Sequence, residues 1–161
     1  MSLRKKPWNR TNQPVYSVSS RSGDAQNMHI LTYATAISMQ PKRFIVGIYH
    51  GTRTLELVEQ EQSFVLQLLA AEQYPLVKLL GQQSGKKVDK ISRLEKRKLL
   101  VEWNGYAVLK GCLAVMELQI LDAMDAGDHK AFLCDVVQWK NLHTGTALTL
   151  DVLREKGIIR A

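Results

Sequence analysis

The chain has 161 residues, of which 45% are hydrophobic and 23% charged, and its formal net charge is +7. This length and composition predict one globular domain with a single core. No apolar run reaches the ~18 residues that a membrane-spanning helix needs, and the first residues lack the apolar segment of a secretion signal. We therefore expect a cytoplasmic protein without a membrane partner.

The positive charge is concentrated in two segments. Residues 1–13 contain four basic residues and no acidic one, and residues 84–98 contain seven basic and two acidic residues. The rest of the chain is close to neutral. Such clusters fit solvated loops, a nucleic acid or a small ligand that bears phosphate. We interpret residues 1–13 as a basic flexible arm and residues 14–161 as the domain.

The first half of the chain alternates between strand-like and helical patterns. Turn residues at 21–24 separate the first two strands, and Pro41 ends the second. Thr52 or Thr54 is placed to cap a helix, and a second short helix is expected at 72–80. The strands predicted here are 14–20, 27–38, 43–50 and 63–69.

The second half begins with a glycine-containing loop at 81–90 and is otherwise rich in strands. These are predicted at 106–109, 112–123 and 130–140. The turn at 125–129 joins the last two as a hairpin, and a third helix is expected at 149–157. Because β-α-β alternation is missing, we predict a mainly β fold with a few short helices, an antiparallel barrel that is closed or nearly closed. Cys112 and Cys134 lie in strand-like runs without a CxxC pair, so buried thiols are expected rather than a disulfide.

The predicted strand 27–38 is polar without being charged. Its polar side chains include Asn27, Thr32, Thr35 and Ser38, and no Asp, Glu, Lys or Arg occurs in it. Small hydroxyl and amide groups are typical of a wall that hydrogen-bonds a neutral ring. We interpret this stretch as the lining of a pocket.

The motif HGTRT at 50–54 suits an anion. Gly51 permits a close backbone approach, while the threonines and Arg53 stand where a helix start presents unpaired N–H groups. Simple helix capping with a surface arginine is the plainer alternative. Combined with the neutral strand 27–38, the motif favours a ring with a phosphate tail, which is the shape of flavin mononucleotide (FMN).

Other motifs carry less information. GQQSGKK at 81–87 has three residues between its glycines where a P-loop has four, and no Ser or Thr follows its lysine. Ser84, Gly85 and Lys90 could contact an anion, or the segment could be a plain flexible loop. The four histidines show no metal-binding spacing, so no metal site is expected.

Several segments together resemble the flavin reductase-like, FMN-binding split-barrel family over roughly residues 14–159. They are NMHILTYATAISMQPKRFIVGIYHGTRTLELV, SFVLQLL, LGQQSGKKVDKI, GDHKAFLCDVV and LREKGII. The resemblance implies a split β-barrel with Greek-key character. It also implies a homodimer that holds FMN near the subunit interface, and electron transfer from NADH, NADPH or a protein donor.

The resemblance also implies which residues contact FMN. His129 would lie close to the flavin and the nicotinamide and is the candidate catalytic residue. The ring and ribityl side would be held by Asn27, Met28, Thr32, Tyr33, Ala34 and Thr35. The phosphate side would be held by Ser38, His50, Thr52, Arg53, Thr54, Ser84, Gly85 and Lys90.

Three points stay open at this level. Many reductases of the family have two prolines before the third strand, whereas this chain reads QPKR, which leaves open whether FMN is a substrate or a fixed prosthetic group. A basic nucleic-acid-binding barrel without enzymatic activity would need aromatic residues among its cations, and residues 86–98 contain none. FMN binding without turnover is a third reading.

Overall fold

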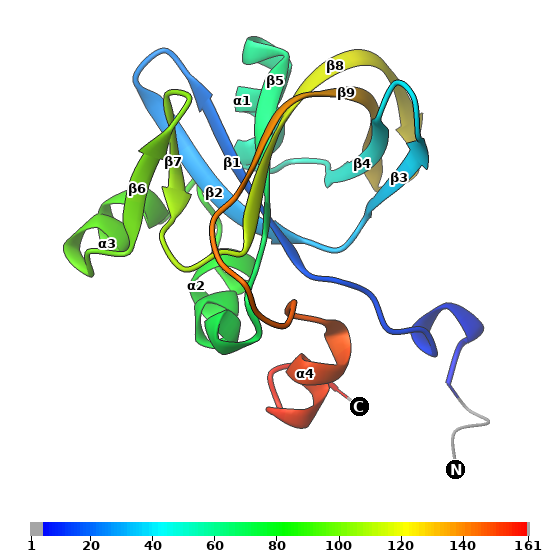
Figure 1. Ribbon diagram of the computed structural model, residues 1–161, viewed down its shortest axis with the longest axis vertical. Coiled ribbons are helices and arrows are strands. Elements are labelled where there is room, and N and C mark those ends of the chain that lie inside the picture. The colour runs from blue at the N-terminus through cyan, green and yellow to red at the C-terminus, as the bar shows by residue number, and fades with distance from the viewer. Residues whose placement is uncertain (1–4, 161) are drawn as a thin grey trace.

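The structure is a computed structural model that describes residues 5–160. Seven strands form one antiparallel sheet in the order β2–β1–β5–β8–β9–β4–β3 (Figure 1). The strands are β1 (Tyr16–Ser22), β2 (Ala25–Leu31), β3 (Ala34–Ser38), β4 (Arg43–Tyr49), β5 (Ser63–Leu68), β8 (Ala114–Ala126) and β9 (His129–Asn141). A separate hairpin consists of β6 (Leu100–Trp103) and β7 (Tyr106–Leu109).

Short helices pack against both sides of the curled sheet. They are α1 (Arg53–Glu61), α2 (Val77–Gln82), α3 (Lys90–Lys96) and α4 (Leu150–Glu155), with 3₁₀ turns at Pro7–Asn9 and Ala71–Leu76. Within residues 5–160, no helix combines the length and apolar character needed to cross a bilayer.

The sheet is open between β2 and β3, although these strands follow one another in the chain. They form its two edges, and Thr32 and Tyr33 link them. The sheet therefore curls into a barrel that is split at this link, and strands that are neighbours in space are not always neighbours in sequence. The prediction of a mainly β, antiparallel split barrel with Greek-key connections is confirmed.

Strand β5 lies between two hydrophobic clusters. Phe64 and Leu66 point into the barrel interior, where α1 also packs, and Val65 points to the opposite side, where α2, α3, α4 and the β6–β7 hairpin pack. This arrangement explains why Phe64, Val65 and Leu66 are all apolar, although neighbouring residues of a strand face opposite sides. The large side chains Phe132 and Tyr106 are fully buried, one in each cluster.

Several sequence-based boundaries differ from the structure. The predicted strand 27–38 is two strands, because the chain bends at Thr32 and Tyr33. The loop predicted at 81–90 contains the last turn of α2 and leads into α3, which Asp89 caps by accepting a hydrogen bond from Ser92 N at 3.0 Å.

Helix α3 and strand β6 were not predicted. The basic residues of 84–98 obscure the buried apolar pair Ile91 and Leu94, which are 7% and 0% exposed on the inner face of α3. Strand β6 pairs with β7 through Asn104–Gly105, both with positive φ (50° and 82°). An Asn-Gly pair is a strong signal for a two-residue hairpin turn.

Residues 5–13 run along α4. Leu150 N donates to Gln13 O at 2.9 Å, Asp151 N donates to Asn12 Oδ1 at 2.9 Å, and Arg154 Nη2 donates to Asn9 O at 3.3 Å. The described part of the arm thus has defined partners at the end of the domain (Figure 1). Residues 1–4 lie outside the described range, and the division at residue 13 stays a prediction.

Buried polar bonds join the β6–β7 hairpin to the barrel. Gln67, fully buried on β5, accepts a hydrogen bond from Leu109 N at 2.7 Å. Arg21 Nη1 donates to Gly105 O at 2.8 Å, and its guanidinium lies 4.4 Å from the centre of the Tyr106 ring. These bonds satisfy backbone groups of β7 that the main sheet does not reach.

We predict that Gln67→Leu lowers the free energy of unfolding by about 1–3 kcal/mol, because the buried Leu109 N–H loses its acceptor. Urea unfolding measures the change. Gln119→Leu, an exposed glutamine on the neighbouring β8, is the control and should stay within about 0.5 kcal/mol of the parent. Equal stability of Gln67→Leu and the parent would contradict the assignment.

Candidate functional site

A cavity of about 300 Å³, here called the α1 cavity, lies between β2, the start of α1 and the segment that follows α2. It collects polar groups that are far apart in the sequence. Its lining includes Asn27, His29, Tyr49, His50, Gly51, Thr52, Arg53, Thr54, Gly81, Gln83, Ser84, Gly85 and Lys90.

The start of α1 forms one wall of the α1 cavity. Thr52 is the N-cap, since its Oγ1 accepts a hydrogen bond from Leu55 N at 3.2 Å. Gly51 makes the preceding bend with φ +79°. The backbone N–H groups of Arg53 and Thr54 stand in the first turn, where a helix offers no internal acceptor. The helix start therefore presents donors and a positive dipole end to the cavity.

Thr54 is fully buried and links α1 to the edge strand β2. Its Oγ1 accepts a hydrogen bond from Asn27 Nδ2 at 2.9 Å and lies 2.8 Å from His29 Nδ1. We assign the single hydroxyl hydrogen of Thr54 to His29 Nδ1, so that the neutral imidazole carries its own hydrogen on Nε2. This chain of bonds orients two side chains of β2 along the cavity.

Two basic groups of the α1 cavity are shifted toward their neutral forms. Burial, followed by the charges of Lys90 and His129, lowers the pKa of the His29 imidazole to about 3, although part of the residue stays accessible. Burial lowers the pKa of the Lys90 ammonium to about 8. Lys90 is only 3% exposed, and the structure gives its Nζ one hydrogen bond, to Leu80 O at 2.9 Å. An anion in the cavity would offset the cost of burying this ammonium.

Glu56 bridges two more cations at the edge of the same cavity. It accepts a hydrogen bond from Lys86 Nζ at 2.9 Å and from Arg53 Nη1 at 2.8 Å. These two partners, Lys86 first, hold the pKa of the Glu56 carboxyl below its usual value. The carboxylate thus occupies the guanidinium of Arg53 in part, and a phosphate would have to share it.

Gly85 is required by close packing. A methyl group at this position would lie 2.5 Å from Asn27 Oδ1. The glycine therefore lets the segment after α2 approach β2 and close the α1 cavity.

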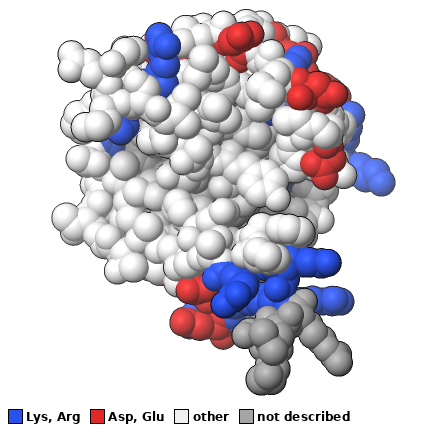
Figure 2. All heavy atoms as spheres, turned by 90° about the vertical axis from the view of Figure 1, so that its right-hand side faces the viewer, with Lys and Arg blue, Asp and Glu red and all other residues white. Residues whose placement is uncertain are grey.

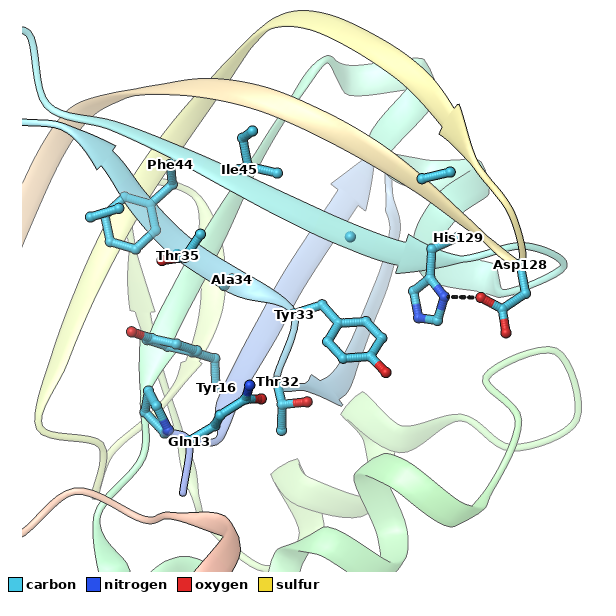
Figure 3. A pocket seen from close by; sticks show the side chains of 14 residues that line it. Gln13, Tyr16, Thr32, Tyr33, Ala34, Thr35, Phe44, Ile45, Asp128 and His129 are labelled. Carbon is cyan, nitrogen blue, oxygen red and sulfur yellow. Dashed lines mark hydrogen bonds and ion pairs between the residues drawn. The ribbon is translucent and has the colours of Figure 1, made fainter. Parts of the chain in front are cut away.

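A second cavity of about 620 Å³, here called the β3 cavity, lies beside the split of the barrel (Figure 3). Its walls come from β3, β4, the start of β1 and the β8–β9 turn. They include Gln13, Tyr16, Thr32, Tyr33, Ala34, Thr35, Phe44, Ile45, Gly47, Asp128 and His129. The volume lies within the range of small-molecule sites.

A row of aromatic rings links the two cavities. The His129 ring contacts Tyr33 edge-on at a centroid distance of 4.9 Å and Tyr49 at 5.2 Å. Its Nδ1 lies 2.6 Å from Asp128 Oδ1, as Figure 3 shows. Tyr33 and His129 line the β3 cavity, whereas Tyr49 lines the α1 cavity. The two cavities therefore lie beside each other at these rings, and together they are here called the groove.

The structure brings most of the predicted site residues to this groove. Those in the α1 cavity are Asn27, His50, Thr52, Arg53, Thr54, Ser84, Gly85 and Lys90. Those in the β3 cavity are Thr32, Tyr33, Ala34, Thr35 and His129. His50 lies at the rim, where its Nε2 is 2.9 Å from Asp125 Oδ1.

Two predicted residues line neither cavity. The Met28 side chain is fully buried in the core cluster, since alternate residues of a strand face opposite sides. Ser38 pairs with Arg43 at the start of β4, whereas the α1 motif follows the end of β4. Seven residues of extended strand, about 20 Å, separate these two points along the chain.

The sequence reasoning missed His29, Tyr49 and the Gly47 position. His29 could have been found, because it stands two residues from Asn27 and so shares its face of the strand. Tyr49 and Gly47 reach the groove only because β4 lies beside the split. Across the described residues 5–160, no group of three or more His, Cys, Asp or Glu side chains is arranged to hold a metal ion.

The groove fits FMN on its own chemistry. The α1 cavity offers helix N–H groups, a guanidinium and a buried ammonium, which suit a phosphate dianion. The β3 cavity offers hydroxyls, backbone groups and aromatic rings without a strong charge of its own apart from the Asp128–His129 pair.

Comparisons with known proteins support the same conclusion. The profile of the family described as "Flavin reductase like domain" matches residues 8–151. The FMN-binding protein from Thermus thermophilus, solved with bound 1-cyclohex-2-enone, is 25% identical with a TM-score of 0.75, over 85% of this chain and 75% of that one. The flavin reductase component BorF of a bacterial two-component tryptophan halogenase shares the fold, with a TM-score of 0.78, 22% identity and coverage of 92% and 91%.

Among curated proteins, this chain is similar to the high molecular weight rubredoxin of Moorella thermoacetica. The two are 26% identical over 136 residues, which are 84% of this chain and 58% of the relative. A putative diflavin flavoprotein of Nostoc is 26% identical over 118 residues, only 20% of its length. This chain thus corresponds to part of these longer proteins.

We predict that His29→Asn makes stability less dependent on pH below 6.5. The pKa of the His29 imidazole is ~6.5 in the unfolded chain and about 3 in the folded chain. Between these values the unfolded state binds the extra proton, so the parent loses stability as the pH falls through this window. From pH 7 to pH 5 the parent should lose about 1–2 kcal/mol more than His29→Asn in urea unfolding.

The control is His143→Gln, which removes an exposed histidine outside both cavities. Its pH dependence should follow that of the parent. Parallel curves for His29→Asn and the parent would show that the His29 ring is not held neutral.

Proposed function

Because this chain belongs to the flavin reductase-like domain family, we propose that it binds FMN and reduces it with NADH or NADPH. The family match places it among the flavin-dependent oxidoreductases of this class. The convergence of Arg53, Lys90 and the α1 start on one cavity, beside a neutral cavity of ring size, is the observation that carries the proposal.

The phosphate of FMN would lie in the α1 cavity. The N–H groups at the start of α1 and the Arg53 guanidinium would donate to it, and the Lys90 ammonium would balance its charge. Ser84 and Asn27 add polar groups on the opposite walls. The neutral state of His29 suits this arrangement, because its Nε2–H can donate a hydrogen bond without adding charge beside Lys90.

The ring would lie in the β3 cavity, between Thr32, Thr35 and the Tyr33–His129 contact. FMN supplies the hydride-accepting ring when it is bound. The protein positions that ring and excludes water from it. Reduction of a flavin by a nicotinamide consumes one proton. Asp128 orients His129 through Nδ1, so that Nε2 would face the ligand and the imidazolium form of the ring would donate that proton.

We further propose a homodimer. The exposed apolar residues of β3, β4, β8 and β9 form an uncharged face, which Figure 2 shows as a broad area without Lys, Arg, Asp or Glu. They include Ile37, Ile45, Leu121 and Val137, each 38–50% exposed. Ile45 also lines the β3 cavity, so a partner on this face would help to enclose the ring.

The buried cysteines agree with a cytoplasmic location. Burial raises the pKa of the Cys112 and Cys134 thiols to about 12, which makes both unreactive. The nucleic-acid alternative finds no support in the comparisons, and the basic cluster at 84–98 does not form one free patch. Lys90 is buried, and Lys86 pairs with Glu56.

The proposal predicts that the protein binds FMN and that Arg53→Ala weakens FMN binding far more than riboflavin binding. Riboflavin has the same ring and ribityl chain but no phosphate. A charge-assisted hydrogen bond is worth roughly 1.5–3 kcal/mol, or about ten- to a hundredfold in affinity, less whatever Arg53 loses by sharing with Glu56. Flavin fluorescence quenching at fixed salt measures both constants.

Glu56→Gln is the matched variant, because it removes the carboxylate that competes for Arg53 and Lys86. It should strengthen FMN binding severalfold and leave riboflavin unchanged. Equal losses for both flavins in Arg53→Ala would place the arginine on the ring or in folding. If the parent quenches neither flavin, the proposed function is wrong.

The dimer proposal predicts two chains per particle at micromolar concentration in light scattering. Ile37→Glu should shift the protein to monomers, because it buries a charge in the apolar interface. Val101→Glu is the control, since Val101 is similarly exposed (42%) but lies on β6, in the separate hairpin sheet. A monomeric parent with FMN bound would refute the dimer.

A further inference from the structure

A third cavity, of about 450 Å³, lies between the arm and α4 and is here called the arm cavity. The polar bonds of Asn9, Asn12 and Gln13 to α4 hold the arm beside it. Its walls therefore come mainly from the arm and from α4 with the residues that follow it, together with Thr32 and Tyr33 of the β2–β3 link.

The arm cavity combines cations with aromatic rings. Lys5, Arg154 and Arg160 line it, together with the indole of Trp8 and the ring of Tyr33. None of its lining residues is acidic. Figure 2 shows Lys and Arg side chains gathered below the uncharged face, with Asp or Glu side chains beside them.

Arg154 is positioned rather than solvated. Its side chain is 14% exposed, and Nη1 donates to Asp151 Oδ1 at 2.6 Å while Nη2 donates to Asn9 O. Its Nε is buried without a hydrogen-bond partner among the described residues. A buried N–H that lacks an acceptor is costly, so a ligand oxygen at this point would be stabilised.

Trp8 and Tyr33 are exposed to an unusual degree for such large rings, at 71% and 60%. Flat aromatic faces beside cations are what a purine base with phosphates requires. The apolar residues Leu150 and Ile159 complete the lining.

The arm cavity continues into the flavin groove. Gln13, Thr32 and Tyr33 line both the arm cavity and the β3 cavity. A ligand in the arm cavity can therefore extend past Tyr33 to the place where the flavin ring would lie.

We propose that the arm cavity binds the adenosine end of NADPH, with Trp8 against the adenine and Arg160 and Lys5 at its phosphates. This inference rests on the proposed function, because it makes the nicotinamide end reach the β3 cavity. Because Arg154 is paired with Asp151, the charge for a further phosphate comes from Lys5 and Arg160. Two such cations with no acidic residue in the lining favour the donor that carries the additional 2′-phosphate.

The test uses adenosine 2′,5′-bisphosphate and 5′-AMP as probes, titrated by calorimetry into the full chain with and without FMN. The bisphosphate should bind more tightly than 5′-AMP. Trp8→Ala and Arg160→Gln should each weaken the bisphosphate about tenfold, by loss of a stacking contact or of a charge-assisted bond. Both side chains are exposed, so the fold should be unaffected.

Trp139→Ala is the matched control, since Trp139 is 68% exposed and lies outside the arm cavity. It should leave the bisphosphate affinity unchanged, and all three variants should bind FMN as the parent does. FMN binding without bisphosphate binding, equal affinities for the two probes, or equal losses in Trp8→Ala and Trp139→Ala would overturn this inference alone. If FMN fails to bind while Trp8→Ala still weakens the bisphosphate, the flavin proposal fails and the arm cavity assignment holds.

Discussion

The failure of β2 and β3 to pair determines where a ligand can bind in this protein. A bend at Thr32 and Tyr33 turns the chain out of β2, so the two sheet edges face each other across the split. Unpaired edges are a liability unless something covers them. Here α1 covers part of β2, through the buried bond from Asn27 to Thr54, and the rest of the split is lined by ring-sized space. The same bend thus creates the groove, and the bond from Asn27 to Thr54 fixes one of its walls.

Burying ionisable groups in the α1 cavity costs folding free energy, and a bound anion would offset part of this cost. Lys90 is almost fully buried with one carbonyl partner, and His29 is held neutral beside it. A core made of apolar residues would avoid both penalties. Buried ionisable groups with strongly shifted pKa values are concentrated at functional sites for this reason. Helix capping needs only Thr52 and does not explain these buried ionisable groups. They therefore favour an anion site over simple capping at the start of α1.

The barrel could be predicted from the sequence because strand alternation and turn residues are local signals, as in 43–50 and the 125–129 hairpin. The residues of the HGTRT motif could be predicted because glycine, hydroxyls and arginine at a helix start favour an anion. Tyr33, Ala34 and His129 could be predicted only from the family resemblance. The family resemblance assigns Met28 to the ring side, but neighbouring residues of a strand face opposite sides, and the Met28 side chain lies in the core. The position of Ser38 relative to α1 depends on the strand pairing, which no local pattern contains. Helix α3 could not be predicted, because its two buried apolar residues, Ile91 and Leu94, stand in a segment with seven basic residues.

The two basic segments of the sequence acquire a common explanation in the groove. Residues 84–98 supply Lys90 and Lys86 beside the α1 cavity, and the arm supplies Lys5 beside the arm cavity. Between them lies the β3 cavity, one wall of which comes from the stretch 27–38 that carries no Asp, Glu, Lys or Arg, and whose other walls contribute the Asp128–His129 pair. Positive charge at both ends and neutrality in the middle match two nucleotides whose rings meet and whose phosphates point apart. A nucleic acid would instead require positive charge along the whole groove. The charge pattern thus favours the flavin and its nicotinamide donor over a polyanion.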